Sequence, residues 1–249
     1  MSLATIDCGS SLFSDEIVDD DFRFGPETPT EDFVCWTLER FKGWRRVFTT
    51  SFGMEGCALV DMYARRTESF EVSYLDTGFF FDETYELIER MRERYPHVAF
   101  VDRGTRLTPE AQAEAYGDEL WKTDPDRCCQ LRKVEPLRAL MGRADIWISG
   151  LRRSQSPTRA GIRLVEWDPR FDVLKLNPLT YWERSDVWSY VQKHDVPYNP
   201  LHERGYPSVG CTHCTVPVNG LRVGEYTRLG RWNGRDKTEC GLHFGDGGK

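Results

Sequence analysis

The sequence predicts an α/β fold in which a doubly wound, mostly parallel sheet forms the core of one domain. Short runs rich in β-branched and aromatic residues alternate with segments of helical periodicity, as expected when helices cross over between parallel strands. A chain of 249 residues, 39% of them hydrophobic, is long enough for one well-packed domain with a small appendage. Three of the strand-like runs end in glycine or small polar residues, where an open parallel sheet binds its ligands.

The first predicted element is a helix over 31–42. Its side chains Phe33, Trp36 and Phe41 recur on roughly one face, and "GPETPT" just before them is a helix-entry signal. The elements predicted after it are strand 45–52, helix 57–66, strand 70–78, helix 82–95, strand 97–102, helix 127–141, strand 145–150, strand 173–179 and helix 183–194. Residues 195–214 are rich in proline and glycine and are predicted to be a loop.

These elements divide the chain into three segments. Residues 1–28 are acidic and aperiodic, and they are predicted to be disordered. Residues 29–218 form the α/β domain that carries the candidate binding loops. Residues 219–249 have too few apolar residues for a core strand and end in "GLHFGDGGK", so they are predicted to form a mobile C-terminal tail.

Composition indicates a cytoplasmic protein that binds neither nucleic acid nor membrane. The net charge is -7, the first twenty residues have no basic region followed by an apolar run, and no apolar stretch could span a bilayer. Eight cysteines in a reducing compartment indicate metal binding or catalysis more than disulfides. Cys8, in the N-terminal segment, and Cys35 and Cys57, on apolar helix faces, are interpreted as structural.

Two strand ends carry candidate substrate-binding residues. In "SFGMEG" (51–56), Ser51 and Gly53 precede a helix, so backbone N–H groups and the helix N-terminus could hold an anion. In "LDTGFFFDETY" (75–85), Asp76, Thr77 and Gly78 end a strand, and they could bind a ligand or simply cap the next helix.

A third strand end is basic. "SGLRRSQSPTRA" (149–160) places Arg152, Arg153 and Arg159 just beyond a strand in a chain that is acidic as a whole. Guanidinium groups bind phosphate or sulfate oxygens in a bidentate manner, although a solvated basic turn is the plain alternative.

Two cysteine pairs, Cys128–Cys129 and Cys211–Cys214, predict a four-thiolate metal site assembled by folding. Adjacent cysteines extend from Cα atoms about 3.8 Å apart and tend to diverge, which is awkward at one tetrahedral zinc ion. A [4Fe-4S] cluster has separate irons at its corners, so it accepts such a pair and is the preferred interpretation. Lys133, one helical turn after Cys129, could donate to the cluster or to a bound substrate.

Taken together, these motifs resemble one family. "CC" followed after 81 residues by "CTHC", with "LDTGFFFDETY", "GLRRSQSPTRA" and a terminal "ECGLH", is similar to the assimilatory adenylyl-sulfate reductases. These are the iron–sulfur branch of the adenylyl-sulfate and phosphoadenylyl-sulfate reductases, and the resemblance covers residues 45–243. It implies an adenine-nucleotide α-hydrolase-like sheet related to PP-loop pyrophosphatases, in agreement with the alternation of strands and helices.

The resemblance also implies roles for individual residues. Cys128, Cys129, Cys211 and Cys214 would hold a [4Fe-4S] cluster that undergoes no net redox change. Cys240 of "ECGLH" would be the nucleophile, with Lys133 between cluster and substrate. Arg228 and Arg231 of "RLGRW" would hold the charged end of the substrate, and Arg152 would bind phosphate.

The implied reaction reduces adenylyl sulfate to sulfite and AMP for cysteine biosynthesis. Cys240 would form an S-sulfocysteine, and thioredoxin or a glutaredoxin would resolve it. Beside Cys240, Glu239 is expected to disfavour the thiolate, whereas Lys237 and His243 are expected to favour it. The active protein is expected to be a homo-oligomer.

Other functions stay open at this point. "GMEG" replaces the "GAED"-like loop often found in iron–sulfur members and is closer to cluster-free phosphoadenylyl-sulfate enzymes, so phosphoadenylyl-sulfate reduction or dual specificity is the main alternative. A non-enzymatic iron–sulfur sensor is another, although it would not need Cys240 beside arginines. A PP-loop ATP pyrophosphatase would need an SGGxDS-type loop, which "SFGMEG" does not match.

Overall fold

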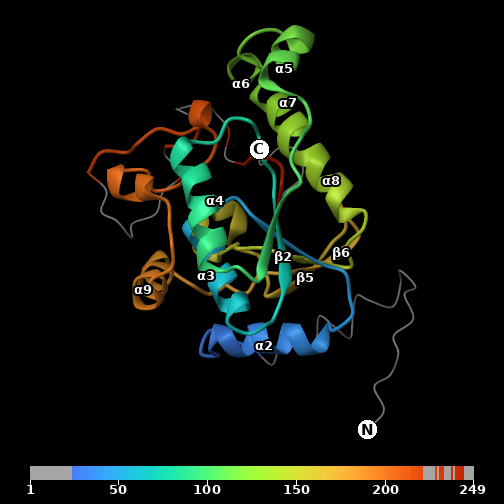
Figure 1. Ribbon diagram of the computed structural model, residues 1–249, viewed down its shortest axis with the longest axis vertical. Coiled ribbons are helices and arrows are strands. Elements are labelled where there is room, and N and C mark those ends of the chain that lie inside the picture. The colour runs from blue at the N-terminus through green and yellow to red at the C-terminus, as the bar shows by residue number, and fades with distance from the viewer. Residues whose placement is uncertain (1–23, 221–227, 229, 233–236, 238, 244–249) are drawn as a thin grey trace.

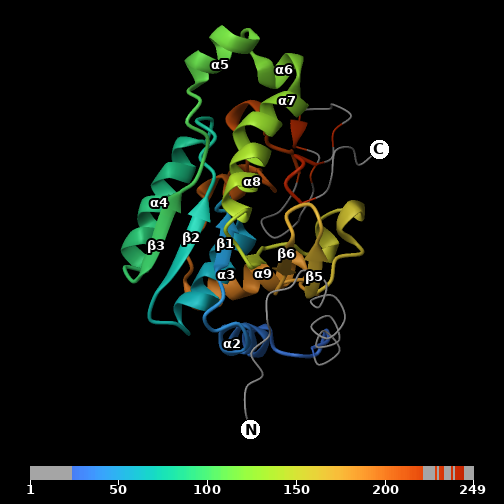
Figure 2. The same ribbon diagram turned by 90° about the vertical axis from the view of Figure 1, so that its right-hand side faces the viewer.

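A six-stranded sheet forms the centre of the protein in a computed structural model, which describes residues 24–220, 228, 230–232, 237 and 239–243 (Figures 1 and 2). The strand order is β3-β2-β1-β4-β6-β5, and every neighbouring pair is parallel except β5 with β6. The strands are β1 (Arg46–Thr50), β2 (Phe70–Tyr74), β3 (Val98–Asp102), β4 (Ile146–Ile148), β5 (Val165–Asp168) and β6 (Val173–Leu176).

Helices cover both faces of the sheet, and a helical group extends beyond its upper end in both views (Figures 1 and 2). The α-helices are α2 (Thr30–Arg40), α3 (Met54–Ala64), α4 (Asp82–Arg94), α5 (Pro109–Tyr116), α6 (Leu120–Thr123), α7 (Pro125–Cys129), α8 (Glu135–Met141) and α9 (Arg184–His194). A π-helical segment, η2 (Gln130–Val134), joins α7 to α8, and short 3-10 helices include η3 (Arg153–Gln155), η4 (Pro157–Arg159), η5 (Pro200–Arg204) and η6 (Thr212–Cys214).

Alternate side chains of the central strands feed two separate hydrophobic layers. Phe48 of β1 and Ile146 of β4 pack into the larger core with α2, α3, α4 and α9. Val47, which precedes Phe48, and Trp147, which follows Ile146, pack instead into the opposite layer with Leu137 of α8. Successive residues of a strand point to opposite faces, so burial on both faces explains why these strands read as continuous apolar runs.

The chain order creates a switch point between β1 and β4. From β1 the chain moves outward to β2 and β3, and it then returns to place β4 on the other side of β1. The connections that leave the carboxyl ends of β1 and β4 therefore run to opposite sides, toward β2 and toward β5 and β6, which leaves a crevice between these two strand ends. The candidate site occupies this crevice.

The predicted doubly wound, mostly parallel sheet is confirmed, but several elements were missed. Helix α5 buries only Gln112, so it has no apolar stripe to detect, and α6 spans a single turn. Strand β5, "VEWD", pairs antiparallel at the sheet edge and carries two acidic residues. The predicted helix over 127–141 is interrupted by the π segment η2.

Two expectations concern the outer parts of the chain. Cys35 was placed on the apolar face of its helix, and this is wrong: Cys35 is exposed, because Phe33, Val34 and Thr37 form the buried stripe of α2. Residues 1–23, including Cys8, and much of 221–249 lie outside the described residues, so the disorder predicted for 1–28 and the mobility of the tail stay predictions. Among the helices described here, none has the length and apolar character needed to cross a bilayer.

Candidate functional site

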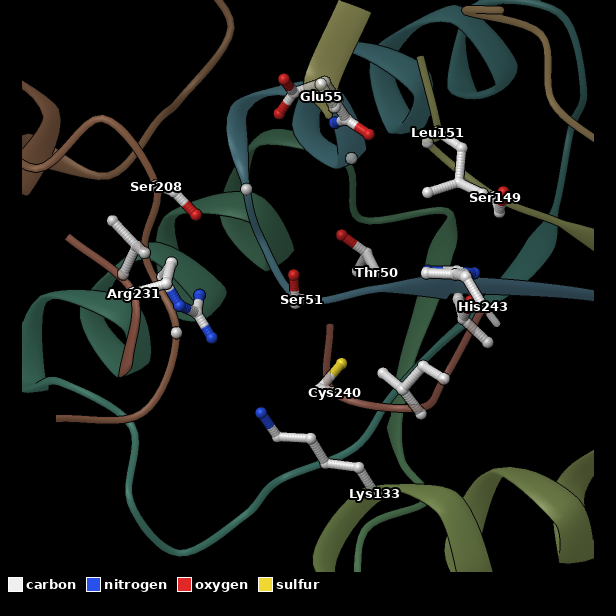
Figure 3. Close-up of a pocket in the computed structure, with 18 of the residues that line it drawn as sticks. Thr50, Ser51, Glu55, Lys133, Ser149, Leu151, Ser208, Arg231, Cys240 and His243 are labelled. Atoms are coloured by element: carbon white, nitrogen blue, oxygen red, sulfur yellow. The ribbon is translucent and has the colours of Figure 1, made fainter. Parts of the chain in front are cut away.

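A cavity of about 200 Å³ opens at the switch point (Figure 3). Thr50 ends β1 and Ser51 follows it, while Ser149 and Gly150 follow β4 from the other side of the crevice. The remaining walls come from the loop before Cys211 and from the C-terminal segment, including Cys240. The site thus combines both strand ends with parts of the chain far apart in sequence.

The loop after β1 brings backbone close to the cavity. Phe52 has a φ of 55°, a left-handed conformation that is costly for a bulky residue, and its ring is buried against Tyr74 and Phe100. A Cβ atom on Gly56 would lie 2.2 Å from the Thr50 hydroxyl, so only glycine allows α3 to start this close to β1. Ser51 and Gly53 line the cavity at the N-terminus of α3, as predicted for an anion-binding turn.

Glu55, in the first turn of α3, holds two buried arginines at the edge of the cavity. Its Oε1 accepts hydrogen bonds from Arg152 Nη2 at 2.8 Å and from Arg184 Nη1 at 3.3 Å. Burial alone would raise the pKa of Glu55, but Arg184 and Arg152 outweigh it and lower that pKa to about 2. Glu55 is therefore an ionised carboxylate at neutral pH.

Arg152, predicted to bind phosphate, lies beneath this surface. Its side chain is 0% exposed, donates to Glu55 and Ser154, and does not line the cavity. Arg159 and Arg184 line it instead. Arg152 therefore supports Glu55 and the start of α3.

The three candidate residues in the turn after β2 have two different roles: one lines the cavity, and two form the turn itself. Thr77 lines the cavity, and its hydroxyl and the Cys211 thiol are hydrogen bonded at 3.3 Å. Asp76 accepts from the backbone N–H of Gly78 at 2.7 Å and from the Tyr85 hydroxyl at 3.0 Å. Asp76 and Gly78 do not line the cavity, so the plain alternative of a structural turn describes them better.

Cys240 is a half-buried thiol in the wall of the cavity, and in the view of Figure 3 it lies between Lys133 and Ser51. Burial works against its thiolate, but Lys133 and a hydrogen bond from the backbone N–H of Leu242 outweigh burial and the charge of Glu239. The pKa of Cys240 is consequently below its ordinary value. A thiol of this kind is prepared to act as a nucleophile.

Lys133 is the cationic partner of this thiol. Burial alone would lower its pKa, but the sulfurs of Cys211, Cys129 and Cys240 around it raise that pKa instead. Lys133 therefore stays protonated, and it interacts electrostatically with two of the predicted metal-site cysteines as well as with the candidate nucleophile.

The expected contribution of His243 is wrong. His243 stacks on Trp147 with ring centroids 5.0 Å apart, and burial together with Lys175 and Arg159 holds its pKa well below the ordinary value. A neutral imidazole adds no positive charge beside Cys240. Lys237 forms an ion pair with Asp126, at the edge of the four-cysteine site.

Arg228 and Arg231, both predicted to hold the charged end of a substrate, line the cavity. Their guanidinium groups lie over the Trp232 ring, 5.2 Å and 4.9 Å from its centroid. Arg231 also packs on the backbone of Gly210, where a Cβ atom would lie 2.2 Å from its Nη1. Arg228 lies 3.4 Å from the carboxylate of Glu239.

The four predicted metal-site cysteines line one small pocket, which shares Lys133 and Cys211 with the main cavity. The rings of Trp121 and His213 stack at 3.9 Å with an interplanar angle of 10°, and Phe79 packs edge-on against both. These three rings line the same pocket. Trp121 precedes one cysteine pair and His213 lies within the other, so the stack joins the two halves.

These four thiols are available as ligands for a metal centre. All four are buried and free of disulfides. Burial and the neighbouring sulfurs raise the pKa of Cys128 to about 11, so the thiolate form here needs a bound positive group. Within the described part of the chain, no three His, Cys, Asp or Glu side chains are grouped to hold one metal ion.

Several lining residues were not singled out from the sequence: Glu55, Ser149, Leu151, Arg184, His202 and Ser208. Glu55, Ser149 and Leu151 lie within the quoted motifs "SFGMEG" and "SGLRRSQSPTRA" but were not named individually. His202 and Ser208 lie in a long loop that carries no local signal.

Comparisons with known proteins identify the family of this chain. The family model described as "Phosphoadenosine phosphosulfate reductase domain" matches residues 45–217. The chain belongs to this family. A relative from Geobacillus thermodenitrificans named "Adenosine 5'-phosphosulfate reductase" is 47% identical over 86% of this chain and 89% of its own length. Another from Bacillus subtilis, "Adenosine 5'-phosphosulfate reductase 2", is 46% identical over 85% of this chain and 88% of its own.

Solved structures extend the family comparison to the fold. A phosphoadenylyl-sulfate reductase from Candida auris matches with a TM-score of 0.72 at 28% identity, covering 84% of this chain and all of that one. An FMN adenylyltransferase from Candida glabrata matches with a TM-score of 0.54 at 19% identity, over 87% of this chain and 68% of that one. The second likeness concerns the fold alone, and it supports the adenine-nucleotide α-hydrolase-like architecture.

Proposed function

We propose that this protein is an oxidoreductase that reduces adenylyl sulfate to sulfite and AMP in assimilatory sulfate reduction. Relatives 46–47% identical over most of the chain carry the name adenosine 5'-phosphosulfate reductase. The observation that carries the proposal is Cys240, a thiol of lowered pKa that shares a cavity at the sheet switch point with Lys133 and Arg231.

The nucleotide is proposed to lie across the switch point. Ser51 and Gly53, at the positive end of α3, suit an anionic group, and Thr77, in the turn after β2, lines the same cavity. Lys133, Arg228 and Arg231 supply positive charge where the sulfate end would meet Cys240.

The first chemical step is a sulfonyl transfer that needs no external electron donor. The Cys240 thiolate attacks the sulfate sulfur, a Cys240 S–S bond forms, and the S–O bond to the bridging oxygen breaks. AMP leaves with that oxygen and the bonding electron pair. Lys133 and the arginines stabilise the negative charge on the group being transferred.

The second step releases sulfite. A thiolate of a dithiol protein, thioredoxin or a glutaredoxin, attacks the Cys240 sulfur, and sulfite leaves with the electron pair of the S–S bond. The mixed disulfide then passes to the second thiol of the donor, which frees Cys240. The dithiol loses two electrons and two protons overall, and the sulfate sulfur gains the two electrons.

Cys128, Cys129, Cys211 and Cys214 are proposed to hold a [4Fe-4S] cluster. They share one pocket with an aromatic wall and with the guanidinium of Arg132 over the Phe79 ring, 4.3 Å from its centroid. When bound, the cluster would supply a fixed anionic group beside Lys133. A cytoplasmic location and a homo-oligomeric state complete the proposal.

Mass spectrometry of the intact chain tests the function directly. Anaerobically purified protein is mixed with adenylyl sulfate without reductant, and a gain of about 80 Da, one SO₃ group, is expected and should be absent from Cys240→Ser. An adduct formed only with the 3′-phosphorylated nucleotide would assign the sister activity. No adduct with either nucleotide would contradict a reductase.

A further inference from the structure

The carboxylate next to the nucleophile is the centre of a dense polar cluster. Glu239 Oε2 lies 2.8 Å from Arg159 Nη2, and Glu239 Oε1 accepts from Arg159 Nε at 3.0 Å. Hydroxyl groups of Ser156 and Thr158 donate to the same Oε1 at 3.3 Å and 3.2 Å, and Arg228 Nη2 lies 3.4 Å from Oε2. The Glu239 side chain is only 7% exposed.

This cluster joins two distant parts of the chain. Ser156, Thr158 and Arg159 belong to the turn after β4, about 80 positions before Glu239 in the sequence. A carboxylate that is bidentate to an arginine and nearly removed from solvent is held more strongly than a surface ion pair. The contacts therefore fix the backbone one residue before the Cys240 thiol.

An electrostatic role for Glu239 at the thiol would be counterproductive. Its negative charge opposes the Cys240 thiolate, and Lys133 has to overcome it. The four donors on the turn and Arg228 compensate the charge of the carboxylate. Glu239 therefore contributes by attaching the chain around Cys240 to the 156–159 turn.

We propose that Glu239 is a positioning residue that docks the segment 239–243 onto the 156–159 turn and thereby holds the Cys240 thiol inside the cavity. The segment has further contacts: Arg170 donates to the carbonyl oxygens of Gly241 and Leu242 at 3.5 Å and 3.3 Å, and the His243 ring stacks on Trp147, but only Glu239 adds a charge-assisted bond directly beside Cys240. Loss of the carboxylate lets the segment leave the cavity more often. The docking itself does not depend on the proposed function, whereas its effect on sulfonation does.

The test compares two reactions of the same thiol in Glu239→Gln, Glu239→Asp and unchanged protein. The rate of Cys240 alkylation by iodoacetamide is measured by peptide mass spectrometry relative to Cys35, which is exposed and serves as an internal reference. Glu239→Gln is expected to raise this ratio on the order of tenfold, because a charge-assisted network that favours the docked state is lost. The rate of sulfonation by adenylyl sulfate in one turnover is expected to fall by a similar factor, and Glu239→Asp should recover part of both changes.

The opposite directions separate docking from other roles. If sulfonation and alkylation both rise in Glu239→Gln, Glu239 acts only through its charge and the proposal is wrong. An unchanged alkylation ratio, or an equal rise in the matched control Glu71→Gln, whose carboxylate forms an exposed pair with Arg103, would also overturn it. If the unchanged protein forms no sulfonated adduct at all, the proposed function fails while the alkylation comparison still decides the docking.

Discussion

Lys133 and Cys240 illustrate how single residues set the chemistry of the site. Each shifts the pKa of the other toward the charged form, Lys133 upward and Cys240 downward. The lysine arises from the π segment between α7 and α8, a local change of helical register that often accompanies functional sites.

Replacing Lys133 by methionine removes the charge and keeps most of the volume. The pKa of Cys240 is expected to rise, so sulfonation at pH 7 should slow by about 10- to 100-fold and then increase with pH as the thiol ionises. In the unchanged protein the same increase should occur at lower pH, because Lys133 lowers the pKa of Cys240. Stopped reactions from pH 6 to 9, followed by intact mass, measure this.

Lys122→Met is the matched control for that experiment. Lys122 is an exposed lysine of α6 paired with Glu119. A shifted profile in Lys122→Met, or an unshifted one in Lys133→Met, would refute the role given to Lys133.

Gly210 controls where Arg231 lies. A methyl group in Gly210→Ala would occupy the space of the Arg231 guanidinium, so that side chain must move away from the cavity. The kcat/KM for adenylyl sulfate is expected to fall about tenfold, the effect of one charge-assisted contact. Gly161→Ala, where a Cβ atom meets open space, should leave kcat/KM unchanged.

At the scale of elements, the start of α3 is a polar junction within the core. Glu55 connects this helix to Arg152 of the turn after β4 and to Arg184 of α9. Buried ion pairs add little net stability, but breaking one is costly because the partners stay buried without their counter-charge. The junction therefore makes three elements depend on one carboxylate.

This junction predicts a specific acid limb of stability. Because the folded state lowers the pKa of Glu55 to about 2, its contribution is complete above pH 4.5 and is lost as the pH falls from 4.5 toward 2. The loss amounts to about 3 kcal/mol. Urea unfolding at pH 7, 4.5 and 3 should show it, and Glu55→Gln should be less stable at pH 7 and lose less on acidification.

The Trp121–His213 stack joins α6 to η6 and thus the two cysteine pairs. Trp121→Ala is expected to lose iron and visible absorbance in air severalfold faster than the unchanged protein, since the wall over the thiols is opened. Tyr116→Ala, at an exposed ring of neighbouring α5, is the control. Equal rates of iron loss in the two variants would contradict this role.

The central strands could be predicted from the sequence because both faces of the sheet are buried, which makes each strand a continuous apolar run. The long helices could be predicted because their apolar residues recur at helical spacing. Helix α5 and strand β5 could not, since one buries a single polar side chain and the other is an acidic edge strand. The residue pattern within α5 or β5 does not reveal which distant segments each of them packs against or pairs with.

At the scale of the whole molecule, sequence motifs identified Cys240, Lys133, Ser51 and Gly53 as a site, and the structure places all four around one cavity. The pattern did not reveal that Arg152 is buried beneath Glu55, nor that His243 is neutral. Both facts depend on which charges tertiary packing brings together, and spacing along a chain does not encode that.

The separation of the two cysteine pairs has a consequence for the unfolded chain. Cys129 and Cys211 are separated by 81 residues, so a cluster bonded to both pairs would act as a covalent cross-link. Closing a loop of this length lowers the entropy of the unfolded state and thereby raises its free energy by about 4–5 kcal/mol, on the relation used for disulfides. Removing iron with a chelator should lower the urea midpoint accordingly, and a chain with an unchanged midpoint would show that no such link exists. If the link does exist, loss of the cluster in oxygen would shorten the lifetime of the folded protein as well as stop the reaction.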